Sequence, residues 1–188
     1  MSRIPMDQYF TPHAAITRRL LTRHGWTKGV ALEPCAGAGA ISHVMQEAGL
    51  EVITGDIDPM MDPDILWNFP VAAKMGACPE VDFIISNPPF NLANEIVKVA
   101  LASCPNVAML LRLSWIEPTA GRRQIWTLMP PTHVHPLHPR PCFTGDGKTD
   151  SSTCAWFVWA PPVRGTRLEP FTDWHLDAQG VLHYDIDT

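Results

Sequence analysis

Short apolar segments alternate with amphipathic segments of ten to fifteen residues along most of this chain, and this alternation constrains the fold more than any other feature. The apolar segments predict strands over 29–34, 51–56, 81–86, 106–113 and 154–160, and the amphipathic segments predict helices over 11–25, 40–49, 92–103 and 119–129. Strands that alternate with helices of this length form βαβ units. We therefore predict an α/β fold with a mostly parallel sheet.

The length and composition favour one globular domain over residues 1–188. No apolar run approaches the ~18 residues that a membrane span requires, and the start MSRIPMDQYF lacks the features of a secretory signal. The five cysteines are scattered without C-x-x-C spacing, which is typical of reduced thiols and not of a disulfide framework or a zinc knuckle. We expect a cytoplasmic protein, in a bacterium or a phage-infected cell, with no membrane contact.

The proline-rich segment 130–141 cannot form a regular helix, so we expect an extended strand or loop there. Its three histidines, His133, His135 and His138, have prolines between them and no nearby acid or cysteine pattern, so no metal site is predicted. Trp156 and Trp159 in the last apolar segment are expected in the core rather than on a stacking surface.

Charge is distributed unevenly along the chain. The net charge of −5 argues against coating nucleic acid through bulk electrostatics. Residues 112–167 nevertheless carry seven bases and three acids, a local excess of +4, whereas the last twenty residues hold five acids and no Lys or Arg. The basic stretch is either a solvated mixed surface or a face that contacts phosphates.

Two segments point to an adenosine-bearing cofactor. In LEPCAGAGAIS (32–42) a strand breaks into small residues before a helix, where Gly37 and Gly39 permit a tight turn and close ligand approach. In GDIDP (55–59), Asp56 ends the next strand about twenty residues later, where an acid commonly binds ribose hydroxyls. The turn lacks the third glycine of the dinucleotide fingerprint, which disfavours NAD.

A third segment, SNPPF (86–90), directly follows the strand VDFII. Neither proline can donate a ladder hydrogen bond, so the strand must end there. The residue before each proline is held extended, so Asn87 and Pro88 form a stiff backbone at the carboxyl end of a strand. Ligands bind at that end of open parallel sheets.

The ordered set DQYFTP, LEPCAGAGA, GDIDP and SNPPF resembles the S-adenosylmethionine-dependent adenine-N6 DNA methyltransferases, in their gamma motif order and in a small stand-alone form of the phage or prophage type. The resemblance covers most of residues 7–160 and is specific only in the motifs. It implies a Rossmann-like class I methyltransferase fold with a seven-stranded, mostly parallel sheet and helices on both faces. It also implies S-adenosylmethionine as cofactor.

The resemblance assigns cofactor-binding and catalytic roles to individual residues. The implied cofactor-binding residues are Thr11, Pro12, Glu33, Cys35, Ala36, Gly37, Asp56, Ile57, Asp64 and Asn87. Asp64 matches the family pattern loosely and can also be read as a plain turn acid. The implied catalytic residues are Asn87, Pro88, Pro89 and Phe90.

The implied chemistry fits these residue types. An exocyclic adenine amine is a poor nucleophile because its lone pair is delocalised into the ring. Acceptors at the Asn87 side chain and the Pro88 carbonyl would bind both N–H groups and stabilise the positive charge that develops on nitrogen. Phe90 would stack on the base, and in-line positioning would supply much of the acceleration.

Duplex DNA is the implied partner, with the target adenine flipped out of the helix. Phe143 is the candidate for the second face of the base, or else packs within its loop. Arg122, Arg123 and Arg140 are the expected phosphate contacts. Many family members carry a separate target-recognition domain that this chain lacks, so specificity must come from short loops, from a homodimer, or be slight.

Three other functions stay open. The tetrad also occurs in enzymes that methylate adenine-N6 or guanine-N2 in RNA and, as N-P-P-Y, in enzymes that methylate glutamine in release factors. The third alternative is a non-catalytic cofactor-binding protein that acts through DNA or a partner. The N-terminal DQYFTP favours DNA, and Phe90 in place of Tyr disfavours the glutamine enzymes.

Overall fold

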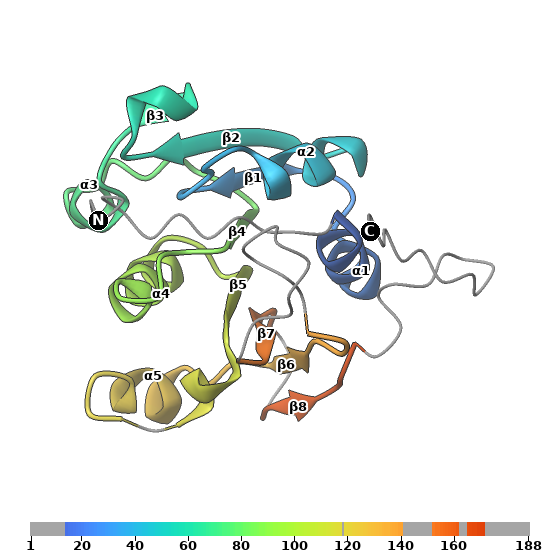
Figure 1. Cartoon of the computed structure of the whole chain (residues 1–188). Coiled ribbons are helices and arrows are strands. Elements are labelled where there is room, and N and C mark those ends of the chain that lie inside the picture. Colours follow the sequence, from blue (N-terminus) through green and yellow to red (C-terminus); the bar gives the residue numbers. More distant parts are fainter. Residues whose placement is uncertain (1–13, 118, 141–151, 162–164, 172–188) are drawn as a thin grey trace, which may run out of the picture.

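The computed structural model describes residues 14–117, 119–140, 152–161 and 165–171. An eight-stranded sheet in the order β3-β2-β1-β4-β5-β7-β6-β8 forms the centre of the molecule (Figure 1). The strands are β1 Val30–Glu33, β2 Glu51–Asp56, β3 Ile65–Leu66, β4 Phe83–Ser86, β5 Val107–Arg112, β6 His133–Pro136, β7 Cys154–Trp159 and β8 Arg167–Leu168. β3, β2, β1, β4 and β5 are mutually parallel, and β7 is antiparallel between β5 and β6.

This topology confirms the predicted α/β fold with a mostly parallel sheet. The sheet has one strand more than the seven that the resemblance implies, and β8 pairs parallel with β6 at its edge. Connections that contain an α-helix join β1 to β2, β3 to β4 and β4 to β5, as is typical of parallel strands.

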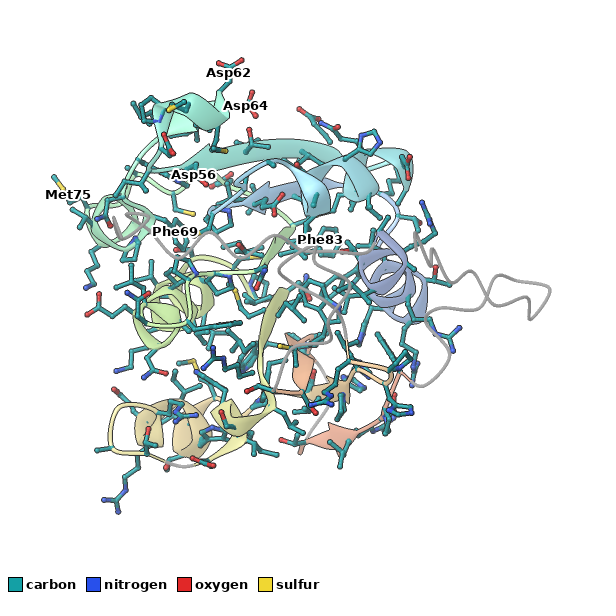
Figure 2. The ribbon with its side chains drawn as sticks, in the orientation of Figure 1. Asp56, Asp62, Asp64, Phe69, Met75 and Phe83 are labelled. Carbon is teal, nitrogen blue, oxygen red and sulfur yellow. The ribbon has the colours of Figure 1, made fainter. Side chains whose placement is uncertain are left out.

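Helices cover both faces of the sheet. α1 Ala14–His24 and α2 Ala40–Glu47 lie on one face, and α3 Phe69–Lys74, α4 Ala93–Ser103 and α5 Arg123–Leu128 lie on the other (Figure 1). Each face has its own hydrophobic cluster, and Figure 2 shows Phe83 toward α1 and Phe69 at the start of α3. Among the described residues, no helix combines the length and apolar character needed to cross a bilayer.

The central strands are buried on both faces, which explains their continuous apolar sequences. Every residue of β4 and β7 is buried. Trp156 is fully buried and Trp159 is 4% exposed, so their assignment to the core is confirmed. Burial of one large apolar side chain contributes about 1.5–3 kcal/mol, so these strands are a principal source of stability.

The structure also contains elements that the sequence patterns did not indicate. They are the two-residue strands β3 and β8, the six-residue helix α3, and the 3-10 turns η1 Pro59–Met61 and η2 Leu113–Ile116. α5 begins at Arg123, later than the predicted 119, because the Arg122 and Arg123 amides donate to the Thr119 carbonyl in a preceding turn. The extended strand or loop expected over 130–141 includes β6.

Candidate functional site

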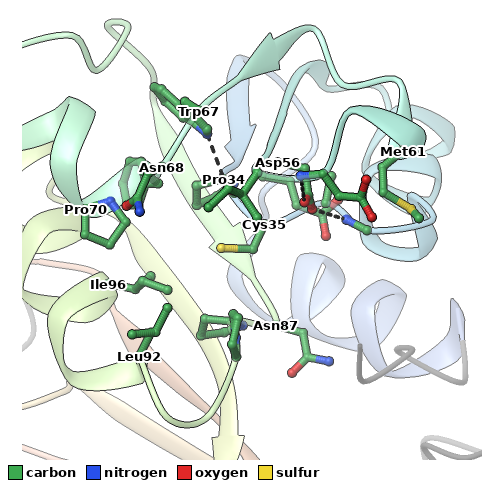
Figure 3. A pocket seen from close by; sticks show the side chains of 18 of the residues that line it. Pro34, Cys35, Asp56, Met61, Trp67, Asn68, Pro70, Asn87, Leu92 and Ile96 are labelled. Carbon is green, nitrogen blue, oxygen red and sulfur yellow. Dashed lines mark hydrogen bonds between the residues drawn. The ribbon is translucent and has the colours of Figure 1, made fainter. Parts of the chain in front are cut away.

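A pocket lies at the carboxyl ends of β1, β2, β3 and β4. Four segments line it: the β1–α2 turn, the end of β2 with η1, the β3–α3 connection, and the segment from Asn87 into α4. Figure 3 shows Pro34, Cys35 and Asp56 facing Leu92 and Ile96 across this space. The pocket is therefore at the end of the sheet where the sequence predicted ligand binding.

The β1–α2 turn has the backbone conformation that its glycines predicted. Gly37 and Gly39 have φ of 52° and 79°, a left-handed region that other residues rarely adopt. A Cβ on Gly39 would also lie 3.1 Å from Ser42 Oγ. Two hydrogen bonds of 2.9 Å close the turn: the Gly39 amide donates to the Ala36 carbonyl, and the Ala36 amide donates to the Gly55 carbonyl.

Asp56 connects two walls of the pocket. One carboxylate oxygen accepts from the Gly37 amide at 2.8 Å, and the other accepts from the Asp58 amide at 2.9 Å. Each carboxylate oxygen has a further acceptor site. Asp56 can thus hold the glycine turn in place and still accept hydrogen bonds from ligand hydroxyls. Its neighbour Ile57 also lines the pocket, and its side chain is 55% exposed.

Two ionisable groups in the pocket, Glu33 and Cys35, have raised pKa values. Burial raises the pKa of Glu33 well above its usual range, and the charge of Asp56 raises it further. A hydrogen bond from the Ser42 amide at 2.7 Å acts in the opposite direction and lowers this pKa. Burial also raises the pKa of Cys35 to about 12, with Asp56 and Glu33 raising it further. Cys35 is consequently a thiol and not a nucleophilic thiolate.

The segment after β4 borders the same pocket. Asn87, Pro88 and Pro89 line it, with Pro88 buried and Asn87 half-buried. Phe90 follows and packs against the hydrophobic cluster on the α1–α2 side. The Arg112 guanidinium lies over the Phe90 ring, with its central carbon 4.7 Å from the ring centroid. Phe90 and Arg112 therefore form a cation–π pair directly after the residues that line the pocket.

The β3–α3 connection supplies pocket residues that the sequence analysis missed. Trp67, Asn68, Phe69 and Pro70 all line the pocket, and Trp67 Nε1 donates to the Pro34 carbonyl at 3.4 Å. Asn68 is the N-cap of α3 and makes no side-chain capping bond. The run Asn-Phe-Pro is a helix-start signal that could have indicated α3.

The structure brings together most of the predicted cofactor residues. Glu33, Cys35, Ala36, Gly37, Asp56, Ile57 and Asn87 all line the pocket. Asp64 does not: its carboxylate accepts from the Thr54 amide and hydroxyl at 2.8 and 2.7 Å, and these bonds lower its pKa. Thr11, Pro12 and Phe143 lie outside the described residues.

The predicted phosphate-contacting arginines lie at the start of α5 and at the end of the described segment 119–140. Arg122 Nη1 donates to the Ser114 carbonyl at 2.9 Å and its Nε to Thr119 Oγ1 at 3.0 Å, so it stabilises the turn before α5. Arg123 is exposed at the start of α5, and Arg140 is exposed at the end of the described segment 119–140. Their role in substrate binding stays a prediction.

Two of the three histidines of the proline-rich segment, His133 and His135, form a packed cluster with His24. His24 Nε2 lies 3.0 Å from His135 Nε2, and His133 stacks on His135 with ring centroids 5.6 Å apart. Within the part of the chain that the structure describes, no group of three His, Cys, Asp or Glu residues is arranged to hold a metal ion.

No protein-family model and no curated protein matches this chain. Several solved structures, however, are similar to it. A proposed RNA methyltransferase from Pyrococcus horikoshii is similar with a TM-score of 0.61 at 18% identity, covering 84% of this chain and 89% of its own. The modification subunit of a proposed type I restriction enzyme from Vibrio vulnificus has a TM-score of 0.61 at 13% identity and covers 93% of this chain.

The 23S rRNA methyltransferase ErmE is also similar, with a TM-score of 0.56 at 18% identity, covering 83% of this chain and 72% of its own. This chain spans about half the length of the restriction-enzyme subunit, 49%. At these identities the likeness is one of fold. The chain therefore has the α/β fold of class I methyltransferases.

Proposed function

We propose that this protein is an S-adenosylmethionine-dependent methyltransferase. The observation that carries this proposal is the position of the Asn87–Phe90 tetrad, which borders a pocket at the carboxyl ends of the parallel strands. The fold supports a methyl-transfer function, and the tetrad supports a planar nitrogen as the acceptor. When bound, the cofactor would supply an electrophilic methyl group on a sulfonium.

The pocket residues fit the parts of such a cofactor. Asp56 can accept from ribose hydroxyls while it holds the Gly37 amide. Asn68 lines the pocket beside Phe69 and offers both a donor and an acceptor to a purine edge. Asn68 is thus a better placed candidate than Asp64 for binding the adenine of the cofactor, since the Asp64 carboxylate is engaged by Thr54.

The tetrad residues would bind and orient the acceptor nitrogen. The Asn87 side-chain oxygen and the Pro88 carbonyl would accept its two N–H groups and favour the developing positive charge. Pro88 is buried and Pro89 fixes the backbone after it, so this carbonyl is positioned before substrate arrives. No strong general base is required, because the methylated ammonium can release its proton to water.

We propose adenine-N6 in DNA as the acceptor, with the base flipped from the duplex against Phe90. This assignment is supported by the motif order of the sequence. An RNA base is the second candidate, because two of the similar folds are described as RNA methyltransferases. Protein glutamine and a purely binding role are further outcomes of the test.

The test is methyl transfer from labelled S-adenosylmethionine to duplex DNA, total RNA and protein side by side, with products identified by mass spectrometry. N6-methyladenine from DNA alone is the expected result. Methylated RNA or protein would keep the methyltransferase and overturn the DNA substrate. Cofactor binding without transfer to any of them would overturn catalysis and favour a binding role.

A further inference from the structure

Arg112 lies beside the tetrad because of the register between β4 and β5. Ser86, the last residue of β4, pairs with Met109 in the parallel neighbour β5. Arg112 is three residues farther along, about 10 Å at ~3.3 Å per residue, so it reaches the level of the tetrad. Strand alternation places it on the same face as Leu110, which belongs to the cluster that Phe90 packs against. This placement explains the contact between the guanidinium and the Phe90 ring.

The hydrogen-bonding capacity of Arg112 is not satisfied within the described chain. Its Nε is buried and has no hydrogen-bond partner there, and no ion pair among the described residues includes it. Other arginines differ: Arg18 pairs with Glu47, and Arg23 pairs with Glu169. A guanidinium is always charged and has five donors, so leaving a buried donor unmatched is costly unless a ligand supplies an acceptor.

We propose that Arg112 binds a phosphate of the substrate strand, next to the nucleotide whose base stacks on Phe90. The proposal rests on the proposed function. Nε and one terminal nitrogen of a guanidinium form a planar fork that matches two phosphate oxygens. A local cation is needed here, because the protein carries a net charge of −5 and cannot attract the strand through its overall field. Arg112 is therefore a positioning residue that fixes the strand relative to Phe90.

The test compares R112Q with the wild-type protein and with R167Q, a control at the exposed edge strand β8. Binding to a labelled duplex is measured at several salt concentrations, along with kcat, KM and the cofactor Kd. For R112Q we expect a roughly tenfold higher KM and Kd for DNA of any sequence, with unchanged cofactor affinity. The slope of log K against log salt should fall in magnitude by about 0.9, the value for one phosphate contact. R167Q should match the wild type.

Neutral methylphosphonate linkages placed one at a time around the target adenine provide a second measurement. A methylphosphonate at one of these positions should weaken DNA binding by the wild-type protein severalfold and should not weaken binding by R112Q any further. If R112Q does not fold, R112K takes its place: it should keep the salt slope and weaken binding. A parallel arm with RNA of the same sequence shows which type of strand supplies the phosphate.

Three results would overturn the role of Arg112: an unchanged salt slope in R112Q, a lower kcat at unchanged DNA affinity, or a loss of affinity for one target sequence only. The second would mean that Arg112 only orients Phe90. The proposed function fails in a different way, since the wild-type protein itself would then transfer no methyl group to DNA or RNA.

Discussion

Asn87 and Asp56 border the same pocket but have separable roles. Asn87 follows β4 and, under the proposed function, would offer its side-chain oxygen to an acceptor nitrogen, whereas Asp56 ends β2 and holds the glycine turn through the Gly37 amide. N87A should lower kcat by about 10²–10³, the cost typical of removing one group that stabilises transition-state charge, and leave cofactor affinity within threefold. The measurements are single-turnover methyl transfer and calorimetric binding of S-adenosylmethionine.

D56A is the matched control for N87A, because it removes a carboxylate from the opposite side of the pocket. It should weaken cofactor binding more than tenfold and destabilise the turn, since the Gly37 and Asp58 amides each lose an acceptor. Equal loss of cofactor affinity in N87A and D56A would contradict the division of roles.

Gly55 makes room for Trp67. A Cβ on Gly55 would collide with Trp67 Nε1 and the adjoining ring atoms, and Trp67 lines the pocket. G55A should therefore cost about 1–3 kcal/mol of unfolding free energy through overpacking and weaken cofactor binding as Trp67 is displaced. Urea denaturation and calorimetry measure the two effects.

The variant W67F has a smaller ring and tests whether the collision with Trp67 causes the loss of stability in G55A. The double variant G55A/W67F should recover part of the stability that G55A loses, giving a favourable coupling energy in a double-mutant cycle. Strictly additive effects would show that Gly55 is required for another reason.

At the scale of elements, long segments were predictable from the sequence and short ones were not. β2 has the predicted bounds 51–56, and α1 ends just before Gly25, whose φ of 68° suits the turn that terminates it. β3 and α3 were missed because two and six residues are too short for a hydrophobic period to emerge.

The shortness of β3 and α3 also explains which site residues the sequence analysis missed. The glycine turn, Asp56 and the tetrad follow recognisable strands, so the topology places them at one end of the sheet. Asn68 and Trp67 belong to the short β3–α3 connection, and their place in the pocket depends on the tertiary fold. Arg112 is an ordinary strand-end residue in sequence, and only the register with β4 brings it to Phe90.

The histidine cluster connects α1 to β6 and predicts a pH-dependent stability. The Glu169 carbonyl accepts from His135 Nδ1 at 2.7 Å, so His135 Nε2 is the acceptor for His24 Nε2. Burial lowers the pKa of both His24 and His135 from 6.5 to about 4, with neighbouring histidines and Arg23 contributing and Glu169 opposing. Both rings are therefore neutral in the folded protein.

The unfolded chain protonates these two histidines near pH 6.5 and the folded chain only near pH 4. Their contribution to stability is complete above pH 6.5 and is lost as the pH falls toward 4. Between pH 6.5 and 4.5, the Tm of H24Q should fall by a few degrees less than the Tm of the wild type, because 1 kcal/mol corresponds to ~2–4 °C in a domain of this size.

The raised pKa of Glu33 acts in the opposite sense, because its ionisation above pH 4.5 favours the unfolded chain. This effect cancels when H24Q is compared with the wild type at each pH. H43Q is the control, since His43 is exposed on α2. Parallel Tm profiles for H24Q and wild type would contradict the role of the cluster.

At the scale of the whole molecule, the pocket joins four segments that are distant in sequence. The β1–α2 turn, the end of β2, the β3–α3 connection and the segment after β4 all contribute to it. A ligand that bridges them binds only the folded chain and must raise its stability by RT ln(1 + [L]/Kd). The response of global stability therefore reports the identity of the ligand.

S-adenosylmethionine at one hundred times its Kd should add about 2.7 kcal/mol to the free energy of unfolding. This increase raises Tm by roughly 5–11 °C for a domain of this size. NAD at the same concentration should leave Tm unchanged, because the β1–α2 turn lacks the third glycine of the dinucleotide fingerprint. D56A should lose the shift with S-adenosylmethionine, whereas N87A should keep it. A shift with NAD and none with S-adenosylmethionine would assign the pocket to a different cofactor and refute the methyltransferase, even though the fold would be the same.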